Sequence, residues 1–290
     1  MENEFILSDL PIEWLVATSI MLGLVVGSFL NVVIYRLPKA MEGEWRSDCC
    51  DLLEIDSPAP AKFNLAFPNS HCPTCEAPIK PWQNIPVLSY LLLRGKCSSC
   101  KTSISLRYPV VEIVAGLLSG AIILKFGFSA QAACALLITW ALISLTMIDI
   151  DTQLLPDSIT LPLLWLGLIA NAFGVFTTLE DALWGAVAGY LALWSVFWLF
   201  KIATGKEGMG YGDFKLLAAL GAWMGWQALP VVIILSSFVG AAIGIAGILI
   251  MGRDKNIPIP FGPYLAIAGW IALLWGEQLT AYYLQLSGVA

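Results

Sequence analysis

The sequence has little charge and almost no histidine. Only 12% of its 290 residues are Asp, Glu, Lys or Arg, and it contains one His. A soluble domain carries about 25% charged residues, so an ordinary soluble enzyme is excluded. Fifteen Lys and Arg against 21 Asp and Glu give a net charge of −6, without the basic excess typical of nucleic-acid-binding proteins. The single His also leaves little room for acid–base catalysis that depends on imidazole.

The sequence is instead rich in long apolar runs. Apolar residues make up 58% of the chain, and the mean hydropathy is +0.79. Because a helix needs about 20 apolar residues to cross a bilayer, the runs predict an all-α polytopic membrane protein with about eight transmembrane helices. They cover residues 11–35, 108–126, 130–148, 159–177, 182–200, 216–226, 229–251 and 261–284.

The charges that are present predict the orientation of the chain. The first run follows Glu2, Glu4 and Asp9 rather than a basic start, so we expect a retained helix and not a cleaved signal peptide. Nine of the fifteen Lys and Arg lie between the first two runs, and basic residues concentrate on the cytoplasmic side. We therefore expect 1–36 as a first transmembrane helix, 37–107 as a cytosolic loop domain and 108–290 as a seven-helix membrane domain, with both termini outside.

Small residues recur four positions apart in several of these runs. Glycine at this spacing lets helix backbones approach closely in lipid, so the pairs predict a tightly packed bundle without indicating any chemistry. The pairs are Gly23 and Gly27, Gly116 and Gly120, Gly185 and Gly189, Gly221 and Gly225, and Gly240 and Gly244.

Four cysteines of the loop form two CxxC pairs, Cys72 with Cys75 and Cys97 with Cys100. Each CxxC turn presents two thiolates on one side, and Zn²⁺ accepts four in a tetrahedron. Two disulfides or a redox-active pair are alternatives, but the expected cytosolic location and the lack of a βαβ pattern count against both. We predict a structural zinc site with these four ligands, and His71 is a less favoured substitute ligand.

Two carboxylates stand at the ends of apolar runs on the side expected to be cytosolic. Asp149 directly follows the third run, and Asp213 precedes the sixth within Gly210-Tyr211-Gly212-Asp213. Two neighbouring carboxylates share a proton, so that one can activate a water while the other donates to the scissile carbonyl oxygen. We predict that Asp149 and Asp213 are catalytic and that Gly210 and Gly212 support them with unusual dihedrals and free space.

Each carboxylate also has a structural interpretation. Asp213 could be an N-cap or a first-turn carboxylate favoured by the helix dipole. Asp151 and Asp157 are nearer to water and are expected to be mainly structural, with Asp157 capping the next helix. The pair Asp149 and Asp213 would also suit a proton relay in a transporter, and a scaffold without catalysis is a further alternative.

Several motifs in the order found here resemble the type IV prepilin leader peptidases, peptidase family A24. They are residues 27–38 (GSFLNVVIYRLP), the two CxxC pairs, residues 107–112 (RYPVVE), the Asp149 segment, residues 210–213 and residues 258–263. The resemblance implies a GxGD-type intramembrane aspartyl protease whose catalytic aspartates fall on Asp149 and Asp213. It also implies a bacterial inner-membrane location, with lipid around the helices, periplasmic termini, and a cytosolic active site and zinc loop.

The family is bifunctional, and this implies substrates and a second cofactor. Its substrates are prepilins of type IV pili and pseudopilins of type II secretion, which carry a short basic leader before an apolar helix. The leader is removed, and the new N-terminal residue is methylated from S-adenosylmethionine. The sequence contains no Gly-rich nucleotide fingerprint, so no residues are predicted to bind this donor. The acidic stretch 42–56 is expected to be solvated rather than a contact for the basic leader.

Overall fold

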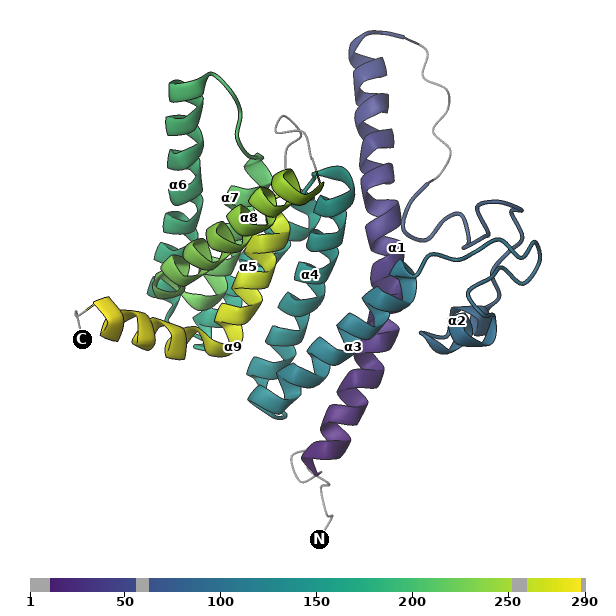
Figure 1. The fold of residues 1–290 in the computed structure, drawn as a ribbon, viewed down its shortest axis with the longest axis horizontal. Coiled ribbons are helices and arrows are strands. Elements are labelled where there is room, and N and C mark those ends of the chain that lie inside the picture. Colours follow the sequence, from purple (N-terminus) through teal and green to yellow (C-terminus); the bar gives the residue numbers. More distant parts are fainter. Residues whose placement is uncertain (1–10, 56–62, 252–259, 288–290) are drawn as a thin grey trace. The chain divides into compact units, whose positions relative to one another are not determined.

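A computed structural model of the chain describes residues 11–55, 63–251 and 260–287, and this part of the chain contains helices and no β-strand (Figure 1). Glu2, Glu4, Asp9, Asp56, Pro258 and Ile259 lie outside the described residues. The all-α prediction is confirmed. Its physical basis is that a backbone in lipid must satisfy its own hydrogen bonds, which a helix does within one segment.

Within the described residues, five helical segments are long and apolar enough to cross a membrane, and the chain is a multi-pass membrane protein. The segments are Ile12–Leu52, Arg107–Phe126, Ala130–Thr152, Leu179–Thr204 and Trp226–Ala246. The predicted number of eight is not confirmed. The fourth and sixth predicted runs fall on α5 (Asp157–Ala172, 16 residues) and α7 (Tyr211–Met224, 14 residues), which are short for a full bilayer crossing.

The chain forms two compact units, residues 1–132 and 133–290. The first unit holds α1 (Ile12–Leu52), η2 (Pro81–Asn84), α2 (Leu88–Leu92) and α3 (Arg107–Phe126). The second holds nearly all of α4 (Ala130–Thr152), and then α5, α6 (Leu179–Thr204), α7, η3 (Trp226–Ala228), α8 (Leu229–Met251) and α9 (Gly262–Ser287). The first unit thus joins the first two predicted spans to the cysteine loop, while the predicted three-domain division stays a prediction.

In the first unit, α1 and α3 lie side by side and antiparallel (Figure 1). The Ser19 hydroxyl donates to the Ser119 carbonyl at 2.9 Å, near one end of the pair. A Cβ added to Gly27 would lie 2.7 Å from the Glu112 Cα, so glycine is needed for this approach. The predicted packing role of the glycines is borne out at this pair of helices.

The first helix is longer than its apolar run. The run ends at Tyr35, whereas α1 continues through Pro38 to Leu52. The acidic side chains on this extension, Glu42, Glu44, Asp48 and Asp51, are all exposed. An apolar run marks only the apolar part of a helix, so hydropathy could not predict this polar extension. The exposure agrees with the solvated interpretation of the acidic stretch.

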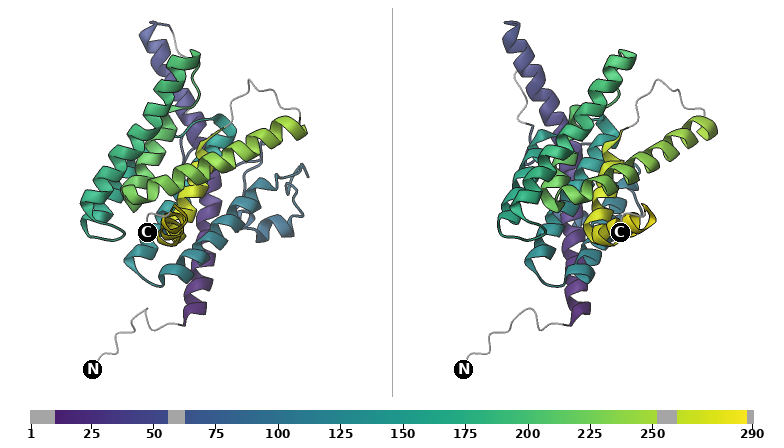
Figure 2. Two further views of the ribbon diagram at one scale, coloured as in Figure 1. Left: turned by 60° about the vertical axis from the view of Figure 1, so that its left-hand side comes forward. Right: turned by 90° about the vertical axis from the view of Figure 1, so that its left-hand side faces the viewer.

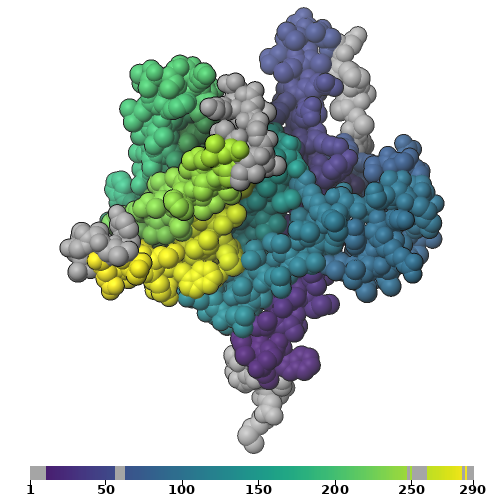
Figure 3. All heavy atoms as spheres, in the orientation of Figure 1, coloured from purple at the N-terminus to yellow at the C-terminus, as the bar shows by residue number. Residues whose placement is uncertain are grey.

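In the second unit, α7 packs against α5 and α6, and the green helices of this unit lie next to one another in Figure 2. A side chain on Gly185 of α6 would overlap the backbone of Gly221 on α7. On the α5 side, the indole of Trp223 donates to the Leu163 carbonyl at 2.8 Å, and the Asn171 amide donates to the Ala222 carbonyl at 2.8 Å. Both donors are buried, so these bonds fix α7 in position. Helices α8 and α9 also lie against each other (Figure 3).

Candidate active site and metal-binding loop

Asp149 is a buried carboxylate one turn before the end of α4. Its side chain is 5% exposed. The carboxylate Oδ2 accepts a hydrogen bond of 3.0 Å from the backbone N–H of Gly262, the first residue of α9. The N–H groups of a first helical turn have no partner within their own helix. Asp149 therefore supplies an acceptor to the start of α9 and is held in place by it.

Asp213 lies in the first turn of α7 and is 6% exposed. Its Oδ1 is buried without a hydrogen-bond partner in the described part of the chain. The carboxylate is close enough to Asp149 for the two to interact electrostatically. Of the two structural alternatives for Asp213, the first-turn position is the one found; Asp213 is not the N-cap, because Gly210 occupies that position.

The two carboxylates therefore form a buried pair at helix ends. Two buried carboxylates that act on each other ionise together only at a large cost in free energy, so such a pair can hold one proton between them. A buried oxygen without a partner is also costly. A water could donate to Asp213 Oδ1, or a protonated Oδ1 could donate to a substrate carbonyl oxygen. The arrangement suits general acid–base chemistry on a peptide bond.

The two glycines beside Asp213 match only part of their predicted role. Gly210 has φ −83° and ψ 154°, which any residue adopts, and Gly212 lies inside α7 without a positive φ. The prediction of unusual dihedrals is wrong. A Cβ on Gly212 would instead lie 2.7 Å from the Leu155 Cβ, whereas a Cβ on Gly210 would have its nearest neighbour 3.9 Å away. Gly212 is needed for packing space between α7 and the segment that joins α4 to α5.

Asp151 and Asp157 stay outside the buried pair, and both are exposed. Asp157 is the first residue of α5, after an N-cap at Pro156, so it does not cap that helix. Its carboxylate accepts from the Lys215 ammonium with both oxygens at 2.7 Å. This surface ion pair connects the starts of α5 and α7.

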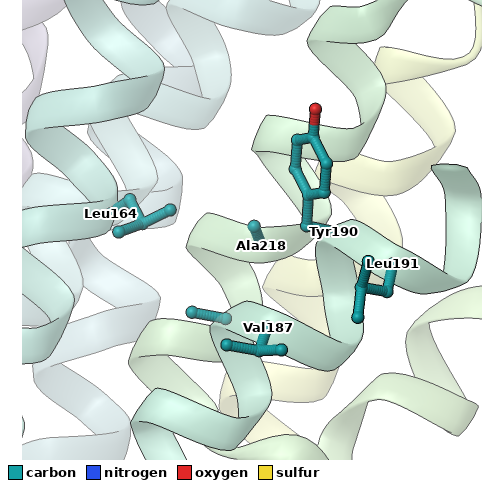
Figure 4. A pocket seen from close by; sticks show the side chains of 6 residues that line it. Leu164, Val187, Tyr190, Leu191 and Ala218 are labelled. Carbon is teal, nitrogen blue, oxygen red and sulfur yellow. The ribbon is translucent and has the colours of Figure 1, made fainter.

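An apolar pocket of about 360 Å³ lies between α5, α6 and α7 (Figure 4). Its lining contains the phenol of Tyr190 and otherwise aliphatic side chains, and no carboxylate. The pocket offers no group that could activate water, so it is not a centre of hydrolysis. The lining residues are Leu164, Ala186, Val187, Tyr190, Leu191 and Ala218.

The loop of the first unit brings together the four predicted cysteine ligands, Cys72, Cys75, Cys97 and Cys100. Their Sγ atoms all lie within 4.8 Å of one another, so the cluster could hold a metal ion. Sulfur atoms at 2.3 Å from a tetrahedral Zn²⁺ are about 3.8 Å apart, and the Cys72 and Cys100 Sγ atoms are 3.7 Å apart. The cluster therefore fits the predicted metal in size, ligand type and ligand number.

The two CxxC turns have the same backbone construction. The Cys72 N–H donates to the Ala77 carbonyl at 3.0 Å, and the Cys97 N–H donates to the Thr102 carbonyl at 2.8 Å. The Thr102 hydroxyl lowers the pKa of the Cys100 thiol to about 6, which favours the thiolate that binds metal. His71 lies outside the cluster, with its Nδ1 2.9 Å from the Asn69 carbonyl.

Comparison with known proteins decides the family. Residues 21–126 match the bacterial peptidase A24 N-terminal domain, and residues 136–245 match the type IV leader peptidase family. The chain belongs to the type IV leader peptidase family. The predictions of this family and of an enzyme are confirmed.

Curated relatives agree with this family along almost the whole chain. A prepilin leader peptidase/N-methyltransferase of Stutzerimonas stutzeri is 61% identical over 98% of both chains. Proteins of the same name from Pseudomonas aeruginosa and Pseudomonas putida are 59% and 53% identical, covering 97% and 95% of this chain and 97% and 96% of theirs. No solved structure matches the chain.

The structure places one contact at the candidate site that the sequence did not predict. The Gly262 N–H belongs to residues 260–263 (Pro-Phe-Gly-Pro), a segment that the sequence marked only as part of the family resemblance. A backbone donor carries no side-chain signal, and its partner is 113 residues away. A proline on each side was the available hint of a fixed turn at the start of a helix.

Proposed function

We propose that the chain cleaves prepilins and pseudopilins with Asp149 and Asp213 as an aspartyl dyad. The observation that carries this proposal is the buried pair, with Asp149 held by Gly262 N–H and Asp213 Oδ1 left without a partner. One carboxylate takes a proton from a water, and the water oxygen bonds to the scissile carbonyl carbon. The other carboxylate donates a proton to the carbonyl oxygen. Collapse of the intermediate breaks the C–N bond and releases a new carboxylate and a free amine.

The proposed substrates fit the position of the pair in the sequence. Asp149 ends an apolar span, and Asp213 begins a helix. A substrate with a basic cytosolic leader and an apolar helix would present its cleavage junction at the edge of the bilayer. Water would then not have to reach the bilayer centre. The placement of the dyad and the metal loop on the cytosolic side of the inner membrane, with periplasmic termini, belongs to this proposal.

The second proposed activity is N-methylation of the new N-terminal residue. The relatives carry this activity in their names, and S-adenosylmethionine would supply the methyl group and leave as S-adenosylhomocysteine as the amine loses a proton. The four-cysteine cluster would hold Zn²⁺ in a structural role, because four thiolates leave no open position on the metal. Zinc would stabilise a loop that has few apolar side chains.

The decisive experiment is cleavage of a purified prepilin by Asp149→Asn and Asp213→Asn variants. Asn keeps the shape of the side chain and removes the acid–base function, so each variant should lose about 10²- to 10⁴-fold in rate. Asp151→Asn and Asp157→Asn are matched controls, since both side chains are exposed. Cleavage at the wild-type rate by either dyad variant would refute the proposal.

The wild-type protein and the same variants also distinguish the proposed protease from a scaffold without catalysis and from a proton-coupled transporter. A scaffold without catalysis would leave even the wild-type protein unable to cut prepilin in detergent. A proton-coupled transporter would show proton flux in liposomes that Asp149→Asn abolishes, again without cleavage by the wild type.

A further inference from the structure

The first unit contains a cavity of about 560 Å³ that the peptidase chemistry does not use. Its walls come from residues 28–36 of α1, 63–105 of the loop and 108–112 of α3, so every lining residue belongs to this unit. Sites that enclose small-molecule ligands have volumes of about 300–1,000 Å³. The cavity therefore has room for a ligand the size of a nucleoside.

A buried carboxylate lines this cavity. Glu112 of α3 is 8% exposed. Its Oε2 accepts from the Val87 N–H at 2.7 Å. This donor is neutral, and among the described residues no basic side chain pairs with Glu112. A buried carboxylate without a basic partner favours a cationic or donor-rich ligand group.

A buried guanidinium lines the same cavity. Arg36 of α1 is 7% exposed, and its Nη1 donates to the carbonyls of Asn64 and Leu65 at 3.3 and 3.4 Å. Its Cζ is 5.9 Å from the centre of the Phe63 ring. In the described part of the chain no carboxylate pairs with it. A guanidinium recognises a carboxylate through two parallel hydrogen bonds, so this side chain is suited to a ligand carboxylate.

We propose that this cavity binds S-adenosylmethionine, with Arg36 on the methionine carboxylate and Glu112 facing the cationic groups. S-adenosylmethionine carries one carboxylate and two cationic centres. These match a buried guanidinium and a buried carboxylate that have no partner of opposite charge among the described residues. Tyr35 and Tyr90 also line the cavity. The Lys39 ammonium lies 3.8 Å from the centre of the Tyr35 ring, so the Tyr90 ring is the better candidate to stack on adenine. The inference rests on the proposed methyltransferase activity and assigns the donor-binding residues.

The cysteine cluster shares a wall with the cavity. Cys72 and Cys97 belong both to the metal-binding group and to the cavity lining. The metal would therefore hold one wall of the donor site in shape without taking part in the chemistry. Removal of the metal should weaken donor binding as well as unfold the loop.

The test is equilibrium binding of radiolabelled S-adenosylmethionine to the purified full-length protein in detergent. Arg36→Met and Glu112→Gln should each raise the Kd at least tenfold. Arg46→Met and Glu44→Gln, both on the exposed extension of α1, are matched controls and should bind as the wild type does. Prepilin cleavage and metal content are measured for every variant, and only variants that keep both are compared. Wild-type affinity in Arg36→Met and Glu112→Gln would overturn the inference.

Photolabelling of the wild-type protein gives a second measurement that needs no variant. Ultraviolet cross-linking of the radiolabelled donor should mark peptides within residues 28–36 or 63–112. Label confined to residues 133–290, in a protein that still cuts and methylates prepilin, would refute this site and leave the proposed function intact. A protein that cuts prepilin but neither binds the donor nor methylates would instead refute the methyltransferase half of the proposed function.

Discussion

The two glycines beside Asp213 should respond very differently to the same substitution. A Cβ on Gly212 would lie 2.7 Å from the Leu155 Cβ, whereas a Cβ on Gly210 would have its nearest neighbour at 3.9 Å. Carbon atoms in contact are normally about 3.5–4.0 Å apart, so Gly212→Ala requires a shift of about 1 Å. A Cβ cannot rotate out of the way, so the backbone of α7 or of the Leu155 segment must move.

The magnitude follows from the cost of this overlap. Overpacking by one methyl group costs about 1–3 kcal/mol. If that cost is met by displacing Asp213 from the dyad, the rate of cleavage falls about 5- to 150-fold, since about 1.36 kcal/mol corresponds to a factor of ten. Gly210→Ala meets no such contact, and its rate should stay within about twofold of the wild type.

The assay is the initial rate of cleavage of a purified prepilin, with thermal unfolding measured in parallel. The clash involves the Leu155 Cβ itself, so Leu155→Gly should restore part of the activity of Gly212→Ala, while Leu155→Ala should restore less. Each double variant is compared with the single variant that carries the same substitution at Leu155. Equal losses in Gly210→Ala and Gly212→Ala would refute this reasoning, because the motif would then not act through packing space.

Three further predictions concern the metal, the surface ion pair and the helix packing. Cys72→Ser should abolish the zinc content measured by metal analysis and impair methylation, with prepilin cleavage kept; a wild-type protein without zinc would contradict this. Asp157→Asn breaks an ion pair with Lys215 whose side chains are 53% and 28% exposed, and such pairs contribute less than about 1 kcal/mol. Its cleavage rate should therefore change less than about fivefold, and a hundredfold loss would place Asp157 in the site. Gly185→Ala would overlap the backbone of Gly221 and should lower the stability by about 1–3 kcal/mol; an unchanged unfolding midpoint in detergent would show that α6 and α7 are not in close contact.

The sequence was most informative where the signal is local. The two CxxC pairs predicted a cluster whose Sγ atoms do lie within 4.8 Å of one another, because a CxxC turn brings its two sulfur atoms together with little help from the rest of the fold. Apolar runs located the helices, since each span must be apolar along its own length. The polar part of α1, up to Leu52, was missed because it has no hydropathy signal.

By itself, the sequence determined an all-α membrane chain, its family resemblance, a four-cysteine loop and two candidate aspartates at helix ends. Only the tertiary structure decided that Asp149 meets the Gly262 N–H and that Asp213 Oδ1 has no partner in the described residues. It also decided that Arg36 and Glu112 line one cavity. The reason is physical: hydropathy and ligand spacing belong to neighbours in the chain. Burial and hydrogen-bond partnership depend on residues that only folding brings together, here as far apart as 113 positions.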